Sequence, residues 1–409
     1  MRVVLLAGRA TGGIAGHVAE LATGLAGAGA GVVVATTDAT ADRWDRLAAG
    51  GGAPVAPDVP VLRLWPGAHH PLAALRRVVR LRRLLAGADV VHAHGHQAGV
   101  LALVVTRGPR ARGRTGGGAG RGPAVVVTWH NAVLADPRSR SRRVLEAAER
   151  LQARGADLLT GASGDLVARA RALGAERVEL TPVAVPDRAA DGGRERGGPV
   201  PSPAPPGLED LPPGALVVLT VSRLAPQKDL PTLVRAAARL GGPRAGAWGT
   251  GAGGTGAGGT GAPVVWCVVG DGDPAVEARV RRLVDELGAP VRLLGARSDV
   301  PELLARADVF ALSSTWEARS LAVQEAMAAG LPVVATRTGG LPDLLEGVGA
   351  LVPVGDDRAL ADAVAALLAD PLARERAGRA SREAFTALPG PRDVLRGWLD
   401  RYARLAAGS

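Results

Sequence analysis

Short apolar runs rich in valine alternate with longer stretches of Ala, Leu and Arg that have a helical period. This alternation predicts βαβ units, in which parallel strands are buried between helices. In the first half we expect strands at VVLLAG, GVVVATT, DVVHAH and AVVVTWH, and helices over residues 17–28, 73–86 and 141–154. In the second half the expected strands are LVVLTVSRL, VVWCVVG, VRLLG, VFALSS, PVVAT and GALVPV. Because the pattern starts afresh there, we expect an α/β protein with two Rossmann-like doubly wound domains.

A stretch rich in proline and glycine separates the two halves. DGGRERGGPVPSPAPPGLEDLPPG, residues 191–214, cannot bury a core and predicts a linker. It would join a first domain over residues 1–190 to a second over residues 215–388. Residues 389–409 contain an amphipathic helix, with an apolar face made of Leu395, Trp398, Tyr402 and Leu405.

Two other low-complexity stretches lie inside the predicted domains. They cover residues 107–123 and 243–263, and the second repeats GTGAG. Each interrupts a compact connection between a helix and a strand. We interpret both as flexible surface insertions with no catalytic role.

Two carboxylates flank a helix start in WEARSLAVQEAMAAGLPVVAT, residues 316–336. The strand VFALSS ends at Ser314, and Ser320 is a good N-cap for the following helix. Glu317 is therefore expected at the carboxyl edge of the sheet, with Glu325 about one and a half turns into the helix. Ligands of open α/β sheets bind outside this edge, where carboxylates can accept hydrogen bonds from sugar or ribose hydroxyls. The same spacing is also common on a solvated helix face.

Two cations stand close together in VSRLAPQKDLPTLVRA. Arg223 follows a strand, Lys228 comes five residues later, and Asp229 marks a helix start. So short a loop can turn both cations onto one ligand. An Arg/Lys pair of this kind would stabilise the charge that develops on a pyrophosphate leaving group. A third loop, TRTGGLPDLLEG, places Gly339 and Gly340 where backbone N–H groups could approach a phosphate or a ribose.

The first strand is followed by a glycine-rich loop, LLAGRATGGIAGHVAELATGL. Gly12, Gly13 and Gly16 lie between the strand and the helix, but a dinucleotide fingerprint would need glycine where the chain has Ala10. Asp38 could still act as a ribose-binding acid. An oxidoreductase is therefore a minor alternative.

All seven histidines lie in the first half of the chain. VTWHN places His130 at a strand end, and DVVHAHGHQAG places His92, His94 and His96 at alternate positions. No carboxylate or cysteine accompanies these three, so a metal site is a minor alternative to one or two histidines that line a substrate cleft.

Composition and charge narrow the range of functions. The chain has 409 residues, of which 47% are apolar and only 2% aromatic, and its net charge is +10. The charge favours anionic partners, but without exposed aromatic residues or a reader motif we expect no nucleic acid. The single cysteine, Cys267, excludes an internal disulfide and is interpreted as a buried structural thiol. With neither a signal peptide nor a spanning helix in the pattern, we expect a cytoplasmic protein, and peripheral contact with the inner membrane surface stays open.

The ordered motifs together resemble a known family, the large retaining glycosyltransferase family 4 with the GT-B fold. The series runs from GGIAGHVAELATGL through DVVHAH, VTWHN, VSRLAPQKDL, VVGDGD and LGARSDVPELLARADVFALSS to WEARSLAVQEAMAAGLPVVATRTGGLPDLL. The resemblance implies an acceptor-binding first domain and a nucleotide-sugar-binding second domain that face each other across a cleft, and a final helix that packs back on the first domain. It also implies that no metal or other cofactor is needed, although Asp271-Gly272-Asp273 has the spelling of a metal motif.

Site residues follow from the resemblance by matching motifs. Arg223 and Lys228 correspond to the pair that binds the donor pyrophosphate, and Glu325 corresponds to the ribose-binding acid. Glu317 corresponds to the acid near the reacting end of the transferred sugar, and His130 to the histidine that contacts that sugar. The remaining donor-binding candidates are Gly12, Gly13, Arg319, Ser320 and Leu321. The family mechanism keeps the anomeric configuration by a same-face reaction, in which the leaving phosphate helps to deprotonate the acceptor hydroxyl.

One departure from the family pattern bears on donor choice. The usual E-G-F-G-L is here Glu317-Ala318-Arg319-Ser320-Leu321, so two glycines are replaced and Arg319 could add a contact to phosphate or sugar, or block the usual pose. We expect transfer of a hexose or N-acetylhexosamine from a UDP- or GDP-sugar to a hydroxyl acceptor, with a lipid-linked or phosphorylated acceptor left open. The alternatives are a catalytically weak nucleotide-sugar-binding protein and a nucleotide-sugar epimerase on the same scaffold.

Overall fold

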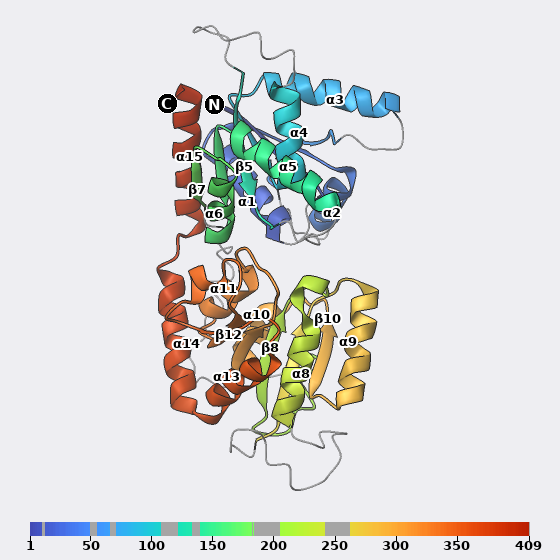
Figure 1. The fold of residues 1–409 in the computed structure, drawn as a ribbon, viewed down its shortest axis with the longest axis vertical. Coiled ribbons are helices and arrows are strands. Elements are labelled where there is room, and N and C mark those ends of the chain that lie inside the picture. Colours follow the sequence, from blue (N-terminus) through green and yellow to red (C-terminus); the bar gives the residue numbers. More distant parts are fainter. Residues whose placement is uncertain are drawn as a thin grey trace. The chain divides into compact units, whose positions relative to one another are not determined.

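The computed structural model describes residues 1–9, 13–49, 55–65, 71–107, 122–132, 140–181, 183, 205–241 and 262–408 (Figure 1). The chain divides into two compact units, Met1–Ala184 with Pro391–Ser409, and Val185–Gly390. Gly12, the first part of the predicted linker and most of both low-complexity stretches lie outside the described residues. The domain limits given above therefore stay a prediction.

The first unit is built on a parallel sheet of seven strands in the order β3-β2-β1-β4-β5-β6-β7. The strands are β1 (Arg2–Ala7), β2 (Gly31–Thr36), β3 (Val61–Arg63), β4 (Val90–His94), β5 (Ala124–Trp129), β6 (Leu158–Gly161) and β7 (Val178–Leu180). The helices are α1 (Gly13–Gly27), α2 (Asp38–Ala49), α3 (Pro71–Ala86), α4 (His96–Arg107), α5 (Arg140–Gly155), α6 (Gly164–Ala172) and α15 (Pro391–Ala407). The apolar runs of β1, β4 and β5 are almost wholly buried, as expected for parallel strands with helices on both faces.

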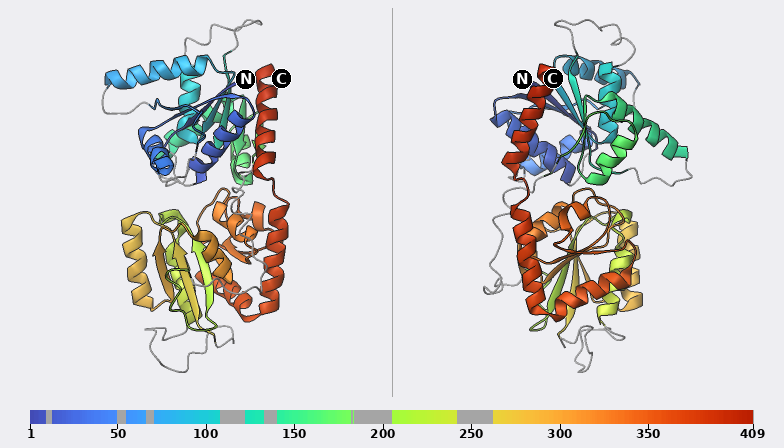
Figure 2. Two further views of the ribbon diagram at one scale, coloured as in Figure 1. Left: turned by 180° about the vertical axis from the view of Figure 1, so that it is seen from behind. Right: turned by 60° about the vertical axis from the view of Figure 1, so that its left-hand side comes forward.

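The C-terminal helix α15 belongs to this first unit and lies against α1 and β4 (Figure 2). Its Trp398 and Tyr402 are fully buried in the same cluster as Leu5, Val18 and Leu25. A buried aromatic side chain removes about 150–250 Å² from water, so these two residues contribute several kcal/mol to the attachment of α15.

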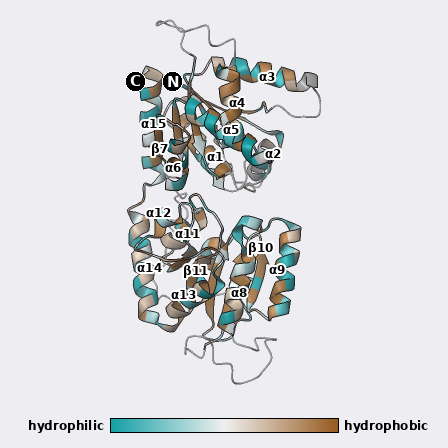
Figure 3. Ribbon diagram, in the orientation of Figure 1, coloured by the Kyte–Doolittle hydropathy of each residue, from teal (hydrophilic) through white to brown (hydrophobic). Residues whose placement is uncertain are grey.

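The second unit is built on a parallel sheet of six strands in the order β10-β9-β8-β11-β12-β13. The strands are β8 (Leu216–Val221), β9 (Val264–Val269), β10 (Val291–Gly295), β11 (Val309–Leu312), β12 (Val333–Thr336) and β13 (Ala350–Val352). The helices are η1 (Pro226–Lys228), α8 (Leu230–Gly241), α9 (Pro274–Leu287), α10 (Val300–Arg306), α11 (Leu321–Ala328), α12 (Leu341–Leu345), α13 (Asp357–Ala369) and α14 (Pro371–Thr386). The strands are mainly hydrophobic, whereas helices such as α9 also carry hydrophilic residues (Figure 3).

Alternate residues of the second sheet enter two separate apolar clusters. Leu219 packs in one cluster, and Val218 and Trp266 pack in the other. Cys267 on β9 is fully buried, and this burial raises the pKa of its thiol to about 12. It is the structural thiol that the sequence predicts.

The fold class predicted from the sequence is confirmed. The pattern does not predict the short strands β3, β6 and β7. The strand order reverses at β1 in the first sheet and at β8 in the second, and ligands of such folds bind at the carboxyl ends of strands near this point. No helix in the described ranges is long and apolar enough to cross a bilayer.

Candidate functional site

The loop after β8 carries Arg223 and is held by backbone pairing with the VVGDGD segment. The Leu224 N–H donates to the Asp271 carbonyl at 2.8 Å, and the Asp273 N–H donates to the Leu224 carbonyl at 2.8 Å. A Cβ atom on Gly272 would lie 2.3 Å from the Leu224 carbonyl oxygen. The glycine of Asp-Gly-Asp therefore permits close backbone packing. The Asp273 side chain accepts from the Ala275 N–H at 2.8 Å and caps α9.

Lys228 and Glu317 meet directly. Lys228 ends the short helix η1, and its ammonium group donates to Oε1 of Glu317, which follows β11. Only 14% of the Lys228 side chain and 11% of the Glu317 side chain are exposed. The Ser314 hydroxyl donates to the same carboxylate oxygen at 2.7 Å. Two of the predicted site residues thus form one enclosed ion pair at the carboxyl edge of the second sheet.

Hydrogen bonds between the two loops hold this ion pair in place. The Ser313 hydroxyl donates to the carbonyls of Lys228 at 2.9 Å and Asp229 at 3.1 Å. The Thr315 N–H donates to the Gln227 carbonyl at 2.8 Å. The backbone around both charged residues is therefore fixed before any ligand binds.

Gly339 and Gly340 support the same loop. A Cβ on Gly339, whose φ is +53°, would lie 1.8 Å from the Glu317 carbonyl oxygen. The Gly340 N–H donates to that same oxygen at 2.9 Å. The sequence suggests that these glycines approach a phosphate or a ribose, but the structure uses the Gly340 N–H to position Glu317.

The remaining second-unit candidates lie around the start of α11. Ser320 is the N-cap, as predicted, and its hydroxyl accepts from the Val323 N–H at 3.4 Å. Leu321 is the first residue of α11. Glu325 is half-buried, and burial raises the pKa of its carboxyl group. Arg223 is exposed, and neither it nor Glu325 forms an ion pair in the part of the chain that is described.

The first unit gathers four buried histidines at the carboxyl ends of β4 and β5. Nδ1 of His94 and Nε2 of His130 share a hydrogen bond at 3.1 Å. His92 lies between the Tyr402 hydroxyl of α15 and the Thr128 hydroxyl, each at 2.6 Å. His17 of α1 packs edge-on to His94 and His130, at 5.7 Å between ring centroids in both cases.

Burial keeps these imidazoles neutral. It lowers the pKa of His17 to about 4 and that of His130 to about 3, and it holds the pKa of His92 and of His94 well below the ordinary value. Neighbouring histidines add repulsion between the charged forms of His92, His94 and His130. A neutral imidazole can donate or accept a hydrogen bond at a substrate without adding charge. No cluster suited to a metal ion occurs within the described ranges.

Sequence reasoning found His130 but missed two other residues of this cluster, His17 beside His130 and Tyr402 beside His92. It assigned no role to His17, and it placed Tyr402 only on an apolar face. The sequence position of His17 could have indicated a role at the site. It lies one turn into the helix after β1, and that turn lies at the carboxyl edge of the sheet. Gly13 begins the same helix.

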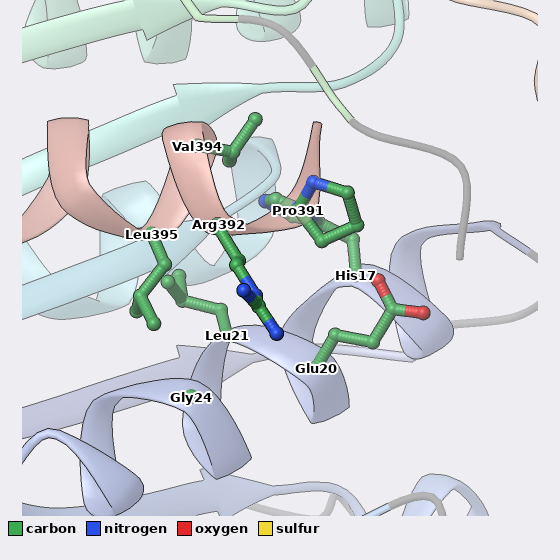
Figure 4. Close-up of a pocket in the computed structure, with 8 residues that line it drawn as sticks. All are labelled: His17, Glu20, Leu21, Gly24, Pro391, Arg392, Val394 and Leu395. Carbon is green, nitrogen blue, oxygen red and sulfur yellow. The ribbon is translucent and has the colours of Figure 1, made fainter. Parts of the chain in front are cut away.

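His17 also lines a cavity between α1 and α15. The cavity has a volume of about 150 Å³. In Figure 4, His17, Glu20 and Leu21 come from α1, and Arg392 and Leu395 come from α15. The lining is mainly apolar, so the cavity adds no cluster of catalytic groups.

Comparison with known proteins matches both parts of the chain to known families. The description "Glycosyl transferase 4-like domain" matches residues 12–186, and "Glycosyl transferases group 1" matches residues 215–370. N-acetyl-alpha-D-glucosaminyl L-malate synthase of Bacillus anthracis is 37% identical over 120 residues, which are 28% of this chain and 31% of that protein. Phosphatidyl-myo-inositol mannosyltransferase of Mycobacterium leprae is 39% identical over 122 residues, which are 29% and 32% of the two chains. The chain thus spans about a third of the length of these two curated relatives.

Solved structures support the fold over the whole chain. Anabaena Alr3699/HepE in complex with UDP-glucose has a TM-score of 0.74 at 20% identity, covering 98% of this chain and 99% of that one. Sucrose-phosphate synthase from Thermosynechococcus elongatus has a TM-score of 0.73 at 22% identity, with full coverage of both chains. At this identity the likeness shows the fold alone.

Proposed function

Because this chain belongs to the glycosyltransferases of family 4 and has the GT-B fold, we propose that it transfers a sugar from a nucleoside diphosphate sugar to a hydroxyl acceptor with retention of configuration. The observation that carries the proposal is the enclosed Lys228–Glu317 pair at the carboxyl edge of the second sheet. A catalytic cation held in place before the reaction stabilises a leaving diphosphate without reorganisation. The UDP-glucose complex of Alr3699/HepE agrees with a donor of this class.

Each site residue has a role in this proposal. Lys228 and Arg223 bind the diphosphate, and the Lys228 ammonium moves part of its interaction from Glu317 to the phosphate oxygens as negative charge develops there. Glu317 lies beside the transferred sugar and stabilises its cationic character. Glu325 hydrogen-bonds the ribose, and His130 contacts the sugar as a neutral imidazole.

The remaining roles concern backbone and small side chains. Gly13, with Gly12, belongs to the loop that approaches the phosphates. Ser320 and Leu321 offer backbone contacts to the donor at the start of α11. No cofactor is assigned, because the leaving phosphate itself accepts the acceptor proton. The transferred sugar has a hexose or N-acetylhexosamine skeleton.

The test combines binding with turnover. Thermal shift with UDP, GDP and ADP identifies the base, since a ligand of the native state raises the Tm. Lys228→Ala and Glu317→Ala should abolish transfer while the second unit stays folded, and near wild-type turnover in both variants would refute the site. Nucleoside diphosphate should be released only when acceptor is added. Donor conversion without acceptor would indicate an epimerase, and tight binding without any product would indicate a binding protein.

We also propose a lipid-linked acceptor, reached by peripheral contact with an anionic membrane. Twelve large apolar side chains of the described residues are exposed, and half of them lie on the consecutive helices α3, α4 and α5: Leu75, Val79, Val104, Val144, Leu145 and Leu151. Helix α3 has no acidic residue. It exposes four arginines that form no ion pair within the described ranges: Arg76, Arg80, Arg82 and Arg83. Apolar side chains beside unpaired arginines suit an anionic bilayer surface.

Known relatives point in the same direction. Proteins similar to this chain include a galactosyltransferase named for a diphosphoundecaprenol substrate and a phosphatidyl-myo-inositol mannosyltransferase. Flotation with phosphatidylglycerol vesicles should recover the protein, and Arg76→Glu with Arg80→Glu should abolish recovery. Equal recovery with phosphatidylcholine vesicles, or preference for a water-soluble phosphorylated acceptor, would overturn this part of the proposal.

A further inference from the structure

Arg319 projects from a rigid segment of the proposed donor site. On one side, Glu317 is fixed by its ion pair with Lys228 and by the Gly340 N–H on its carbonyl. On the other side, the Ser320 hydroxyl caps α11. The arginine therefore has little backbone freedom, and its guanidinium can be held ready for a ligand at low entropic cost.

The guanidinium of Arg319 is incompletely satisfied. The side chain is half-buried, and its Nε atom is enclosed without a hydrogen-bond partner in the described part of the chain. Burial lowers the pKa of Arg319, and the charge of Asp343 on α12 partly opposes this. An enclosed donor without a partner destabilises the fold. Arg319 also forms no ion pair in the described part of the chain, and a bound anion would give this half-buried charge a partner.

The neighbouring cations already have a partner in the proposed mechanism. Lys228 and Arg223 serve the diphosphate, and Glu317 pairs with Lys228 before the donor binds. A third cation therefore exceeds what a diphosphate with a neutral sugar requires. The pattern that this chain resembles has phenylalanine where the chain has Arg319, so the extra charge departs from that pattern.

We propose that Arg319 binds a carboxylate on the transferred sugar, so that the donor is a nucleoside diphosphate linked to a hexuronate. This inference rests on the proposed function and specifies its substrate. The two terminal nitrogens of the guanidinium match the two oxygens of a carboxylate in an end-on contact. Arg319 thereby acts as a specificity residue.

The experiment compares acidic and neutral donors that share a base. Wild type, Arg319→Gln and Arg319→Lys are assayed with UDP-glucuronate against UDP-glucose, and with GDP-mannuronate against GDP-mannose. We expect wild type to prefer one uronate donor at least tenfold in kcat/KM. Arg319→Gln should lose at least tenfold in kcat/KM with that donor, so that the preference for the uronate over the neutral donor disappears. Arg319→Lys should recover only part of the loss, because an ammonium group lacks the planar fork.

Binding of UDP and GDP without a sugar shows whether Arg319 recognises the diphosphate or the carboxylate of the sugar. We expect Arg319→Gln to bind the nucleoside diphosphate as wild type does. Weaker binding in this variant would place Arg319 on the phosphates and overturn the inference, as would a wild-type preference for neutral sugars. Should Arg319→Gln fail to fold, Arg319→Met provides the same comparison with a fully apolar side chain. If wild type binds neither UDP nor GDP, the proposed function fails as well. Failure of the proposed function is therefore distinguishable from failure of the inference about Arg319.

Discussion

Acidification should destabilise the first unit far more than the second, because the buried histidines must stay neutral in the fold. The pKa of His17 is lowered from 6.5 to about 4 and that of His130 to about 3. A group with a depressed folded-state pKa binds a proton more readily when unfolded. Below pH 6.5 the unfolded chain therefore takes up protons that the folded chain refuses, and stability falls as the pH falls toward 4.

The size of the effect follows from these pKa values. For His17 alone, a change from pH 7 to pH 5 lowers the free energy of unfolding by about 2 kcal/mol. His130, His92 and His94 act in the same direction, although their titrations are coupled and do not simply add. A total of about 4 kcal/mol would lower the Tm of a unit of this size by roughly 8–16 °C.

Calorimetry at pH 7, 6 and 5 can measure this prediction. All seven histidines lie between His17 and His130, so the second unit is an internal control without histidine. His17→Gln is the matched variant. Between pH 7 and pH 5 its free energy of unfolding should fall by about 2 kcal/mol less than that of wild type. The reasoning would be refuted if the Tm of the first unit were the same at pH 7 and pH 5. It would also be refuted if the free energy of unfolding of His17→Gln fell as much as that of wild type.

Three further variants test other contacts. Lys228→Arg keeps the charge but replaces a compact ammonium group in an enclosed pair with Glu317, and we expect kcat to fall at least ~100-fold with little change in Tm; Arg235→Lys, on the surface of α8, is the control. Gly339→Ala places a Cβ 1.8 Å from the Glu317 carbonyl oxygen at a positive φ, so urea denaturation should show a loss of about 3 kcal/mol or more. Gly355→Ala is the control for the backbone term alone, because its φ is also positive at +78° but no atom lies within 4 Å, and its loss should be only about 1–2 kcal/mol. Tyr402→Phe removes the hydroxyl that lies 2.6 Å from Nδ1 of His92, and the same assay should show a loss of about 1–3 kcal/mol; wild-type stability would contradict the assigned bond.

The strands that position the sites could be predicted from the sequence because burial on both faces leaves a readable apolar run. β1, β5, β8 and β9 are rich in valine, and most of their residues are buried. β3 has half-exposed and exposed side chains and only three residues, so no pattern distinguishes it from a loop. The topology then brings the strand ends together, since β8 and β11 are neighbours although many residues separate them in sequence.

The contacts inside the sites depend on tertiary structure and could be predicted only in part. The sequence, with its resemblance to a family, singles out Lys228 and Glu317 but not the bond between them. It assigns Gly339 to a ligand, whereas its missing side chain makes room for the Glu317 carbonyl. Tyr402 reaches His92 across 310 positions of sequence, and no local pattern encodes such a distance.

Composition and structure together support the role proposed for Lys228. The chain has 49 lysines and arginines, and Lys228 is the single lysine, so the other 48 are arginines. Elsewhere in the described residues arginines form ion pairs, such as those with Asp42, Asp210 and Glu346, whose side chains are 48%, 70% and 63% exposed. In the pair with Glu317 the cation is enclosed, and it must exchange part of its contact between a carboxylate and a ligand. An ammonium group can do this by rotating three equivalent donors about one atom, whereas a guanidinium must move a rigid plane. The one position where this chain uses lysine is thus the one where the proposed reaction requires a compact, reorientable charge.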